Sequence, residues 1–127
     1  MTTPPAEIVA ALVGLGLLAT DRPATGAPLT GGVSSDIWRI ETPTGPICAK
    51  RALAKLKVEA DWRAPVERNV FEARWLVRAG EAAPGAVPKV LGQDAAAGVL
   101  ALEWLDPADH PTWKAEMLAG RVDPEFA

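Results

Sequence analysis

Two adjacent glycines in the first third of the chain have the composition of an anion-binding turn. Gly31 and Gly32 lack a Cβ atom, so the backbone can turn sharply there and approach a phosphate chain closely. Ser34 and Ser35 add hydroxyl and amide N–H groups near the same turn. An ordinary hairpin turn is the alternative, because Gly-Gly followed by polar residues is also common there.

Lys50 is the second group that could meet an anion. It ends the segment 47–50, which reads Ile-Cys-Ala-Lys. Side chains alternate along a strand, so Cys48 and Lys50 would share one face. A lysine buried beside an apolar strand face needs an anionic partner. The alternative is a strand-end lysine in solvent, because three further basic residues follow it: Arg51, Lys55 and Lys57.

Two glutamates are candidates for the partner of Lys50. Glu72 lies between Phe71 and Leu76, near the apolar stripe of a predicted helix. Glu67 lies one turn earlier and on another face. Either glutamate could instead form a surface salt bridge along the helix, with Arg68, Arg74 or Arg78. These possibilities stay open on the residues alone.

A helix is predicted near the N-terminus. Thr3 followed by two prolines is typical of a helix start. The helix is expected to run to about Ala19 and to end at Asp21–Pro23. Gly14 and Gly16 do not match the spacing of a phosphate loop, and no strand precedes them. They are expected to let the helix pack closely against a neighbour.

The apolar period changes to two over residues 27–51. Residues 36–42 and 47–50 are predicted to form a β-hairpin, because 42–46 reads Thr-Pro-Thr-Gly-Pro and has turn chemistry. An earlier strand would end at Leu29–Thr30, just before the glycine pair. The predicted sheet would therefore carry both the turn and Lys50.

The candidate glutamates would be positioned by a second helix. Residues 52–63 are interpreted as a loop with a short helical turn, and Pro65 opens a helix that runs to about Ala79. Gly80 is the predicted stop. The apolar positions with helical spacing are Val66, Val70, Phe71, Ala73, Leu76 and Val77.

The last third of the chain predicts three more elements. Two strands, 90–93 and 99–104, are joined by a turn at 94–98. A last helix begins near Pro111 and reaches Gly120, and residues 124–127 read as the start of another.

This order of elements resembles the N-terminal lobe of a protein-kinase-like fold. Four segments carry a closer resemblance to the aminoglycoside phosphotransferase and choline kinase superfamily: LTGGVSSDIW at 29–38, ICAK at 47–50, ERNVFEAR at 67–74 and LEWLDP at 102–107. The resemblance covers about residues 27–120. It implies an α+β fold, with an antiparallel sheet of about five strands, an N-terminal helix and a helix carrying Glu72, and without the C-terminal lobe.

The resemblance also implies a site for ATP. Lys50 would reach the α- and β-phosphates and pair with Glu72, which the spacing seen in the family favours over Glu67. The glycine turn would cover the phosphates, and the strand end after Leu102 would be a hinge that binds adenine through the Glu103 carbonyl and the Leu105 amide. Lys50 and Glu72 are thus the predicted catalytic residues. The predicted nucleotide-binding residues are Gly31, Gly32, Val33, Ser34, Ser35, Ile37, Cys48, Lys50, Leu102, Glu103 and Leu105.

The chain departs from the superfamily in two places. Asp36 stands where many relatives carry asparagine, and an acidic group is less suited to contact phosphate. The superfamily's base and Mg²⁺ ligands come from a His-Gly-Asp…Asn loop and a later Asp, all after the hinge. Here the lone His110 lies in Asp-His-Pro and is expected to be an exposed loop residue. No metal ligand is therefore predicted in this chain, and the Mg²⁺ ligands are expected in the absent lobe.

These observations predict two parts and one function. Residues 1–105 would form the nucleotide-binding lobe, and residues 106–127 a linker and the start of a truncated second lobe. The full-length enzyme would transfer the γ-phosphate of ATP to a hydroxyl of an aminoglycoside, sugar or amino alcohol. This chain alone is expected to be inactive.

Two other interpretations remain. The chain could be a binding module on the same scaffold that forms a homodimer through its exposed cleft face: Trp104, Leu105, Trp113, Leu118 and Phe126. It could also be an α+β domain unrelated to kinases, in which Lys50 and the glycine turn have no nucleotide role.

Composition excludes several classes of partner. The 127 residues carry a net charge of −3, which disfavours nucleic-acid binding. One cysteine excludes an internal disulfide and a cysteine-cluster zinc site. The apolar run 8–19 is shorter than the roughly 17–25 residues of a bilayer span. No Lys or Arg precedes this run, which is unlike a signal peptide. A cytoplasmic protein without a membrane partner is expected.

Overall fold

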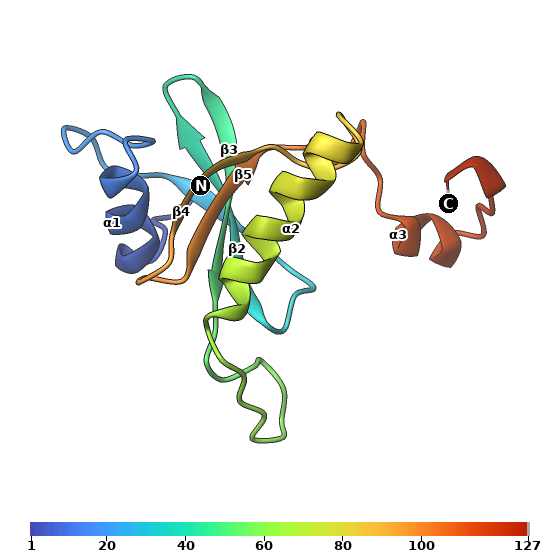
Figure 1. Cartoon of the computed structure of the whole chain (residues 1–127), viewed down its shortest axis with the longest axis horizontal. Helices are drawn as coiled ribbons and strands as arrows, with labels where there is room; N and C mark the ends of the chain where they lie inside the picture. Colours follow the sequence, from blue (N-terminus) through green and yellow to red (C-terminus); the bar gives the residue numbers. More distant parts are fainter. Residues whose placement is uncertain (127) are drawn as a thin grey trace.

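A five-stranded antiparallel sheet forms the centre of the computed structural model, which describes residues 1–126. Its strand order is β1-β2-β3-β5-β4, and helices α1 and α2 pack on opposite faces (Figure 1). The predicted combination of helices with an antiparallel sheet of about five strands is confirmed. The elements are α1 (Ala6–Gly14), β1 (Gly26–Leu29), β2 (Ser35–Thr42), β3 (Gly45–Ala52), α2 (Arg68–Ala82), β4 (Val90–Asp94), β5 (Val99–Glu103), α3 (Trp113–Leu118) and a short 3-10 helix (Pro124–Phe126).

Helix α1 ends at Gly14, and the prediction that it reaches Ala19 was wrong. Gly16 adopts the left-handed region with φ +74°. Its amide donates to the Val13 carbonyl at 2.9 Å, and the Leu17 amide donates to the Leu12 carbonyl at 2.9 Å. This pair of bonds is a Schellman motif, which satisfies the last carbonyls of the helix and turns the chain away.

The predicted Thr3 cap is also absent, because α1 begins after Pro5 without a side-chain cap. The backbone of Thr2 instead forms a β-bridge with Gly26. The two segments exchange two hydrogen bonds, from the Thr2 amide to the Gly26 carbonyl at 2.8 Å and from the Gly26 amide to the Thr2 carbonyl at 2.9 Å. The residues before α1 therefore extend the edge of the sheet beside β1.

One face of the sheet packs on α1 and forms the larger core. Ile8 and Leu12 of α1 are fully buried there. Alternation along the strands supplies the other side of this core: Ile40, Ile47, Ala49 and Ala101. The opposite face packs on α2, where Ala73 contacts Leu100 and Leu102 in a second cluster. The residues that flank Ala49 in β3 and Ala101 in β5 therefore point toward α2.

Helix α2 is shifted along the sequence from its prediction. It begins at Arg68 instead of Pro65 and continues through Gly80 to Ala82. The left-handed turn that follows is made by Gly85, with φ +82°. Phe71 was predicted to lie on the apolar stripe, yet it is 65% exposed. Ala73 is buried, and a residue two positions away points to the opposite side of a helix.

The two hairpins follow the predicted pairing. Thr42 pairs with Gly45 at the β2–β3 turn, where Gly45 has φ +117°. Between β3 and α2, the predicted helical turn is absent. That loop instead carries an isolated antiparallel β-bridge between Lys55 and Arg63, so the two sides of the loop lie next to each other. The loop therefore folds back on itself next to the end of β3.

The segment after β5 extends away from the sheet (Figure 1). Helix α3 begins after Thr112, whose hydroxyl accepts a hydrogen bond from the Ala115 amide at 3.3 Å. This start agrees with the prediction near Pro111. Ala127, the end of the predicted segment 106–127, lies outside the described residues. Across residues 1–126, each helix is too short or too polar to cross a membrane.

Candidate functional site

Lys50 and Glu72 form an ion pair between β3 and α2. Strand alternation explains the position of Lys50, because its neighbour Ala49 is buried in the core beneath α1. Glu72 precedes the buried Ala73, so it lies at the edge of the α2 contact with the sheet. The side chains are 22% and 35% exposed. The predicted pairing is present, and the catalytic role of the two residues remains a prediction.

The structure does not show the alternatives that the sequence left open, in which Glu67 meets Lys50 or Glu72 pairs with an arginine of its own helix. Glu67 is exposed and precedes α2. Arg78 pairs with Glu81 at 3.2 Å, and the Arg74 guanidinium lies 5.9 Å from the Phe71 ring. Among residues 1–126, the salt-bridge partner of Glu72 is therefore Lys50 and not an arginine of its own helix.

The glycine turn joins β1 to β2, and the β1–β2 pairing ends next to this turn at Leu29 and Ile37. Gly31 has φ +101°, a conformation that L side chains rarely adopt. A Cβ atom added at Gly32 would lie 3.3 Å from Ile37 Cδ1. Ile37 is directly opposite Lys50 in the β2–β3 register. Small residues at the turn therefore allow close packing over the strand position that pairs with Lys50.

Hydrogen bonds hold this turn by its carbonyl groups. The Val33 carbonyl accepts from the Lys57 amide at 2.8 Å, and the Ser34 carbonyl accepts from the Leu53 amide at 3.0 Å. Within the part of the chain that the structure describes, the amides of Gly31, Gly32, Val33 and Ser34 donate to no protein group. A turn whose amides are free in this way can donate them to an anion.

Asp36 does not lie on the same sheet face as the Lys50 side chain. It alternates with Ile37 and pairs with Arg51 at 3.0 Å and with Lys57. Arg51 also contacts Glu7 of α1 at 3.2 Å. Strand alternation directs the Asp36 carboxylate toward α1, and its expected unfavourable effect on a phosphate contact stays a prediction.

The charges around Asp36 lower the pKa of its carboxyl group. The hydrogen bond from Lys57 contributes most, burial opposes it, and the hydrogen bond from Arg51 adds to the lowering. The pKa of Glu7 is lowered too, first by backbone hydrogen bonding and then by Arg51. Both carboxylates therefore favour the folded state most when they are ionised.

This shift predicts how the stability of the chain depends on pH. The folded pKa of Asp36 lies below its ordinary value of 3.8, so its contribution is present above that pH and is lost as pH falls through the folded pKa. Asp36→Asn is expected to lower the free energy of unfolding by up to about 1 kcal/mol at pH 7. Urea unfolding at several pH values measures this difference, which should shrink toward acid.

Asp109→Asn is the matched control, because Asp109 is exposed and lies outside this cluster. A difference between Asp36→Asn and the parent chain that stays constant down to pH 3 would contradict the assignment of the lowered pKa.

Cys48 lies on the same strand face as Lys50, two residues away. It is opposite Leu102 of β5 and opposite Arg39 of β2. Burial raises the pKa of the Cys48 thiol, and the Lys50 charge only partly offsets this. Ile37 and Cys48, which were predicted to line an adenine pocket, therefore stand on one face of the sheet, next to Lys50.

The predicted hinge begins where β5 ends. Leu102 is buried, and Glu103 is fixed by Lys89, whose amide donates to Glu103 Oε1 at 2.8 Å and whose carbonyl accepts from the Glu103 amide at 2.9 Å. Leu105, beyond the end of the strand, is 37% exposed. Adenine binding by these residues remains a prediction.

The contacts of two arginines near these residues were not predicted from the sequence. The Arg39 guanidinium lies 5.4 Å from the centre of the Trp104 ring and 3.1 Å from Glu41 Oε1. Strand alternation could have placed Arg39 on the face of Cys48. Arg68 contacts the carbonyl of Ser34, and no sequence pattern indicates that contact.

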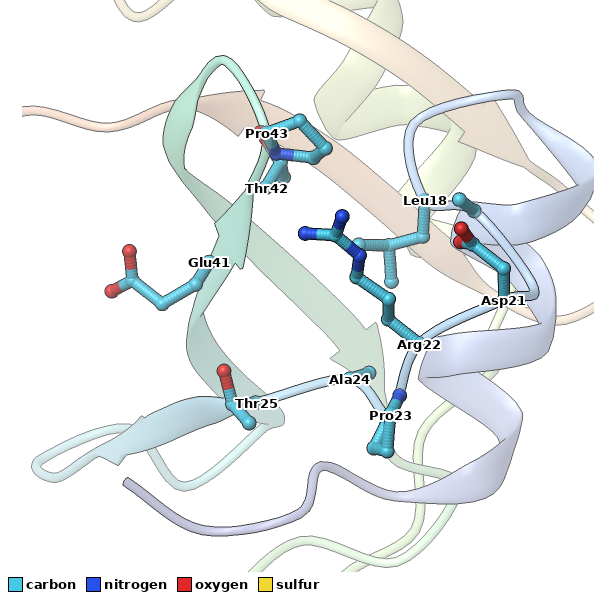
Figure 2. A pocket seen from close by; sticks show the side chains of 10 residues that line it. Leu18, Asp21, Arg22, Pro23, Ala24, Thr25, Glu41, Thr42 and Pro43 are labelled. Atoms are coloured by element: carbon cyan, nitrogen blue, oxygen red, sulfur yellow. The ribbon is translucent and has the colours of Figure 1, made fainter.

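Other candidate sites are separate from this one. A cavity of ≈ 390 Å³ lies between the segment 18–25 and the start of the β2–β3 turn, and Figure 2 shows the Arg22 side chain reaching into it. Its lining contains neither Lys50 nor Glu72. Residues 1–126 contain no cluster of three or more potential metal ligands. His110 is exposed in the loop after β5, as expected.

Comparison with known proteins gives a fold-level match. No protein-family model matches the chain, and no curated protein matches it. Fourteen solved chains do match. One of them, described as a "putative fructosamine-3-kinase" from Thermobifida fusca YX-ER1, has a TM-score of 0.51 and 26% sequence identity. The alignment covers 80% of this chain and 32% of that chain. The chain therefore has a small-molecule kinase-like fold and spans about a third of the length of the protein that it matches.

Proposed function

We propose that this chain is the nucleotide-binding lobe of an ATP-dependent small-molecule kinase of the aminoglycoside phosphotransferase type. The observation that carries the proposal is the ion pair between Lys50 and Glu72, beside a glycine turn with free amides. A carboxylate that holds the ammonium group of a lysine keeps that charge in place for a polyphosphate. The similarity to a kinase of 26% identity supports this interpretation.

The residues present fit a nucleotide. Lys50 and the amides between Gly31 and Ser34 would hold the phosphates, because both supply hydrogen-bond donors to negative oxygens. Ile37 and Cys48 supply an apolar surface on the same sheet face for the base. Bound ATP would supply the phosphoryl group for transfer. The role of this chain is to bind and orient that group through fixed donors.

The acceptor would be a hydroxyl of a sugar, an aminoglycoside or an amino alcohol. The matched protein carries the name of a kinase that acts on a fructosamine, and this chain spans 32% of it. In our proposal, residues 1–105 are the nucleotide-binding lobe and residues 106–127 lead into the part of such an enzyme that binds acceptor and Mg²⁺.

A second candidate function is a binding module that self-associates. The observation that favours it is the exposure of large apolar side chains beyond β5, where Trp113 is 52% and Leu118 is 80% exposed. Such surfaces are typical of contacts with another chain. Light scattering separates a monomer from a dimer, and a dimer that forms without any response to nucleotide would favour this second function.

The single cysteine provides the test of nucleotide binding. Because the pKa of the Cys48 thiol is raised, its alkylation by iodoacetamide at pH 7.5 is expected to be slower than that of a free cysteine, which has more thiolate. MgATP is expected to slow the reaction further by covering Cys48. The rate is measured by mass spectrometry of the labelled chain.

Two comparisons make this test specific. Magnesium with inorganic sulfate controls for ionic strength, and an unfolded sample in urea gives the rate of the unprotected thiol. Equal alkylation rates with and without saturating MgATP would argue against a nucleotide beside Cys48.

A further inference from the structure

The first residue of α2 makes an unusual set of contacts. Arg68 Nη2 donates to the carbonyls of Ser34 and Leu53, the latter at 2.8 Å. Arg68 Nη1 donates to the carbonyls of Ala64 and Pro65, at 3.3 and 2.6 Å. One guanidinium group thus gathers carbonyls from the glycine turn, from the end of β3 and from the entry to α2.

The contact with Ser34 and Leu53 lies where the β2–β3 pairing ends. Ser35 and Ala52 are the last pair in the register, so Ser34 and Leu53 are the next residues outward. The Leu53 amide also donates to the Ser34 carbonyl. Arg68 therefore bridges the two segments directly beyond the paired residues of β2 and β3, and it connects both segments to α2.

Local helix chemistry does not account for an arginine at this position. The positive end of the helix dipole is at the N-terminus, where acidic side chains are favourable and basic ones are not. The first turn of α2 contains no acidic residue that would compensate. Satisfying four backbone carbonyls, which would otherwise lack these donors, explains the choice of a planar guanidinium group.

Arg68 also shares a helix face with the ion pair of the site. Residues four positions apart lie one above the other on a helix, so Arg68 and Glu72 point from the same side of α2. Glu72 binds Lys50 of β3, and Arg68 binds the turn that precedes β2. The spacing between the turn and Lys50 is thus set from a single helix.

We infer that Arg68 is a positioning residue that orders the end of the glycine turn and directs the Ser35 amide toward the ligand of Lys50. The C=O and N–H groups of a trans peptide unit point in opposite directions. The Ser34 carbonyl shares its peptide unit with the Ser35 amide, so holding this carbonyl toward Arg68 turns the Ser35 amide away from α2. The inference rests on the proposed nucleotide-binding function and adds the residue that orders the turn.

Hydrogen exchange on the whole chain, read residue by residue by NMR, tests this assignment together with MgATP titration. Arg68→Lys keeps the charge but offers three rotatable donors in place of a planar fork. We expect the Leu53 amide to exchange about tenfold faster in Arg68→Lys, and MgATP to bind about tenfold more weakly, as for loss of one charge-assisted hydrogen bond. Amides in the middle of the sheet, such as that of Ala49, should keep their protection.

Arg74→Lys is the matched control, because Arg74 is an exposed arginine of the same helix. Unchanged Leu53 exchange and unchanged MgATP affinity in Arg68→Lys would overturn the inference. The inference would also be wrong if all amides of the sheet exchanged faster by the same factor, because Arg68 would then stabilise the whole fold and not the turn in particular. Arg68→Ala should increase the exchange rate of the Leu53 amide and weaken MgATP binding more than Arg68→Lys does. If Arg68→Ala does not fold, the result for Arg68→Lys decides.

The two proposals fail in different ways. If the parent chain does not bind MgATP at all, the proposed function is wrong. The exchange measurement still reports whether Arg68 holds the turn. If the parent chain binds MgATP and Arg68→Lys binds it equally well, only the role of Arg68 is wrong.

Discussion

Lys50→Met is expected to weaken the binding of MgATP to this chain by about 10- to 100-fold. A hydrogen bond to a charged group contributes roughly 1.5–3 kcal/mol, and each 1.4 kcal/mol is a tenfold change in affinity. Methionine keeps an unbranched side chain of similar length on the β3 face while removing the ammonium group. Calorimetric titration of the parent chain and the variant with MgATP measures the difference.

Two further variants make this result interpretable. Lys114→Met removes the same charge from an exposed residue of α3, and it should bind MgATP like the parent chain. Glu72→Gln should weaken binding less than Lys50→Met, because it leaves the ammonium group present but less constrained. Equal affinities of the parent chain and Lys50→Met would remove the central support for a nucleotide site.

Leu100→Ala is expected to lower the free energy of unfolding by about 3 kcal/mol, within the usual range for a buried leucine. Leu100 is fully buried and lies opposite Lys50 in the sheet. It packs against Ala73 of α2. Its removal leaves a cavity between the sheet and the helix that carries Glu72. Urea unfolding followed by tryptophan fluorescence measures the loss.

Leu118→Ala is the matched control for this truncation. Leu118 is 80% exposed, so the same change there should stay within about 0.5 kcal/mol of the parent chain. A loss at Leu100 no larger than the loss at Leu118 would show that the contact between α2 and the sheet contributes little to stability.

Local patterns predicted most of the sheet and its turns. Alternating apolar residues predicted the strands, and the glycine positions predicted turns such as that at Gly45, with φ +117°. The same alternation predicted that Cys48 and Lys50 share one strand face. These features depend on the backbone conformation of neighbouring residues, so a short stretch of sequence contains the information.

Helix boundaries depended on competition between nearby signals. Gly16 ends α1 through a Schellman motif, whereas Gly80 lies within α2 and does not end it. A glycine is compatible with either outcome, and the packing around it selects one. The exposure of Phe71 has the same origin, because the sheet contacts the face of α2 around Ala73.

The sequence by itself determined the antiparallel sheet, the strand face of Lys50 and the turn that precedes β2. Only the tertiary structure decided that Glu72 and not Glu67 meets Lys50, and that Arg68 reaches the Ser34 carbonyl. These contacts join residues far apart in the chain. Their geometry depends on how helices pack on the sheet, which no local period of the sequence encodes.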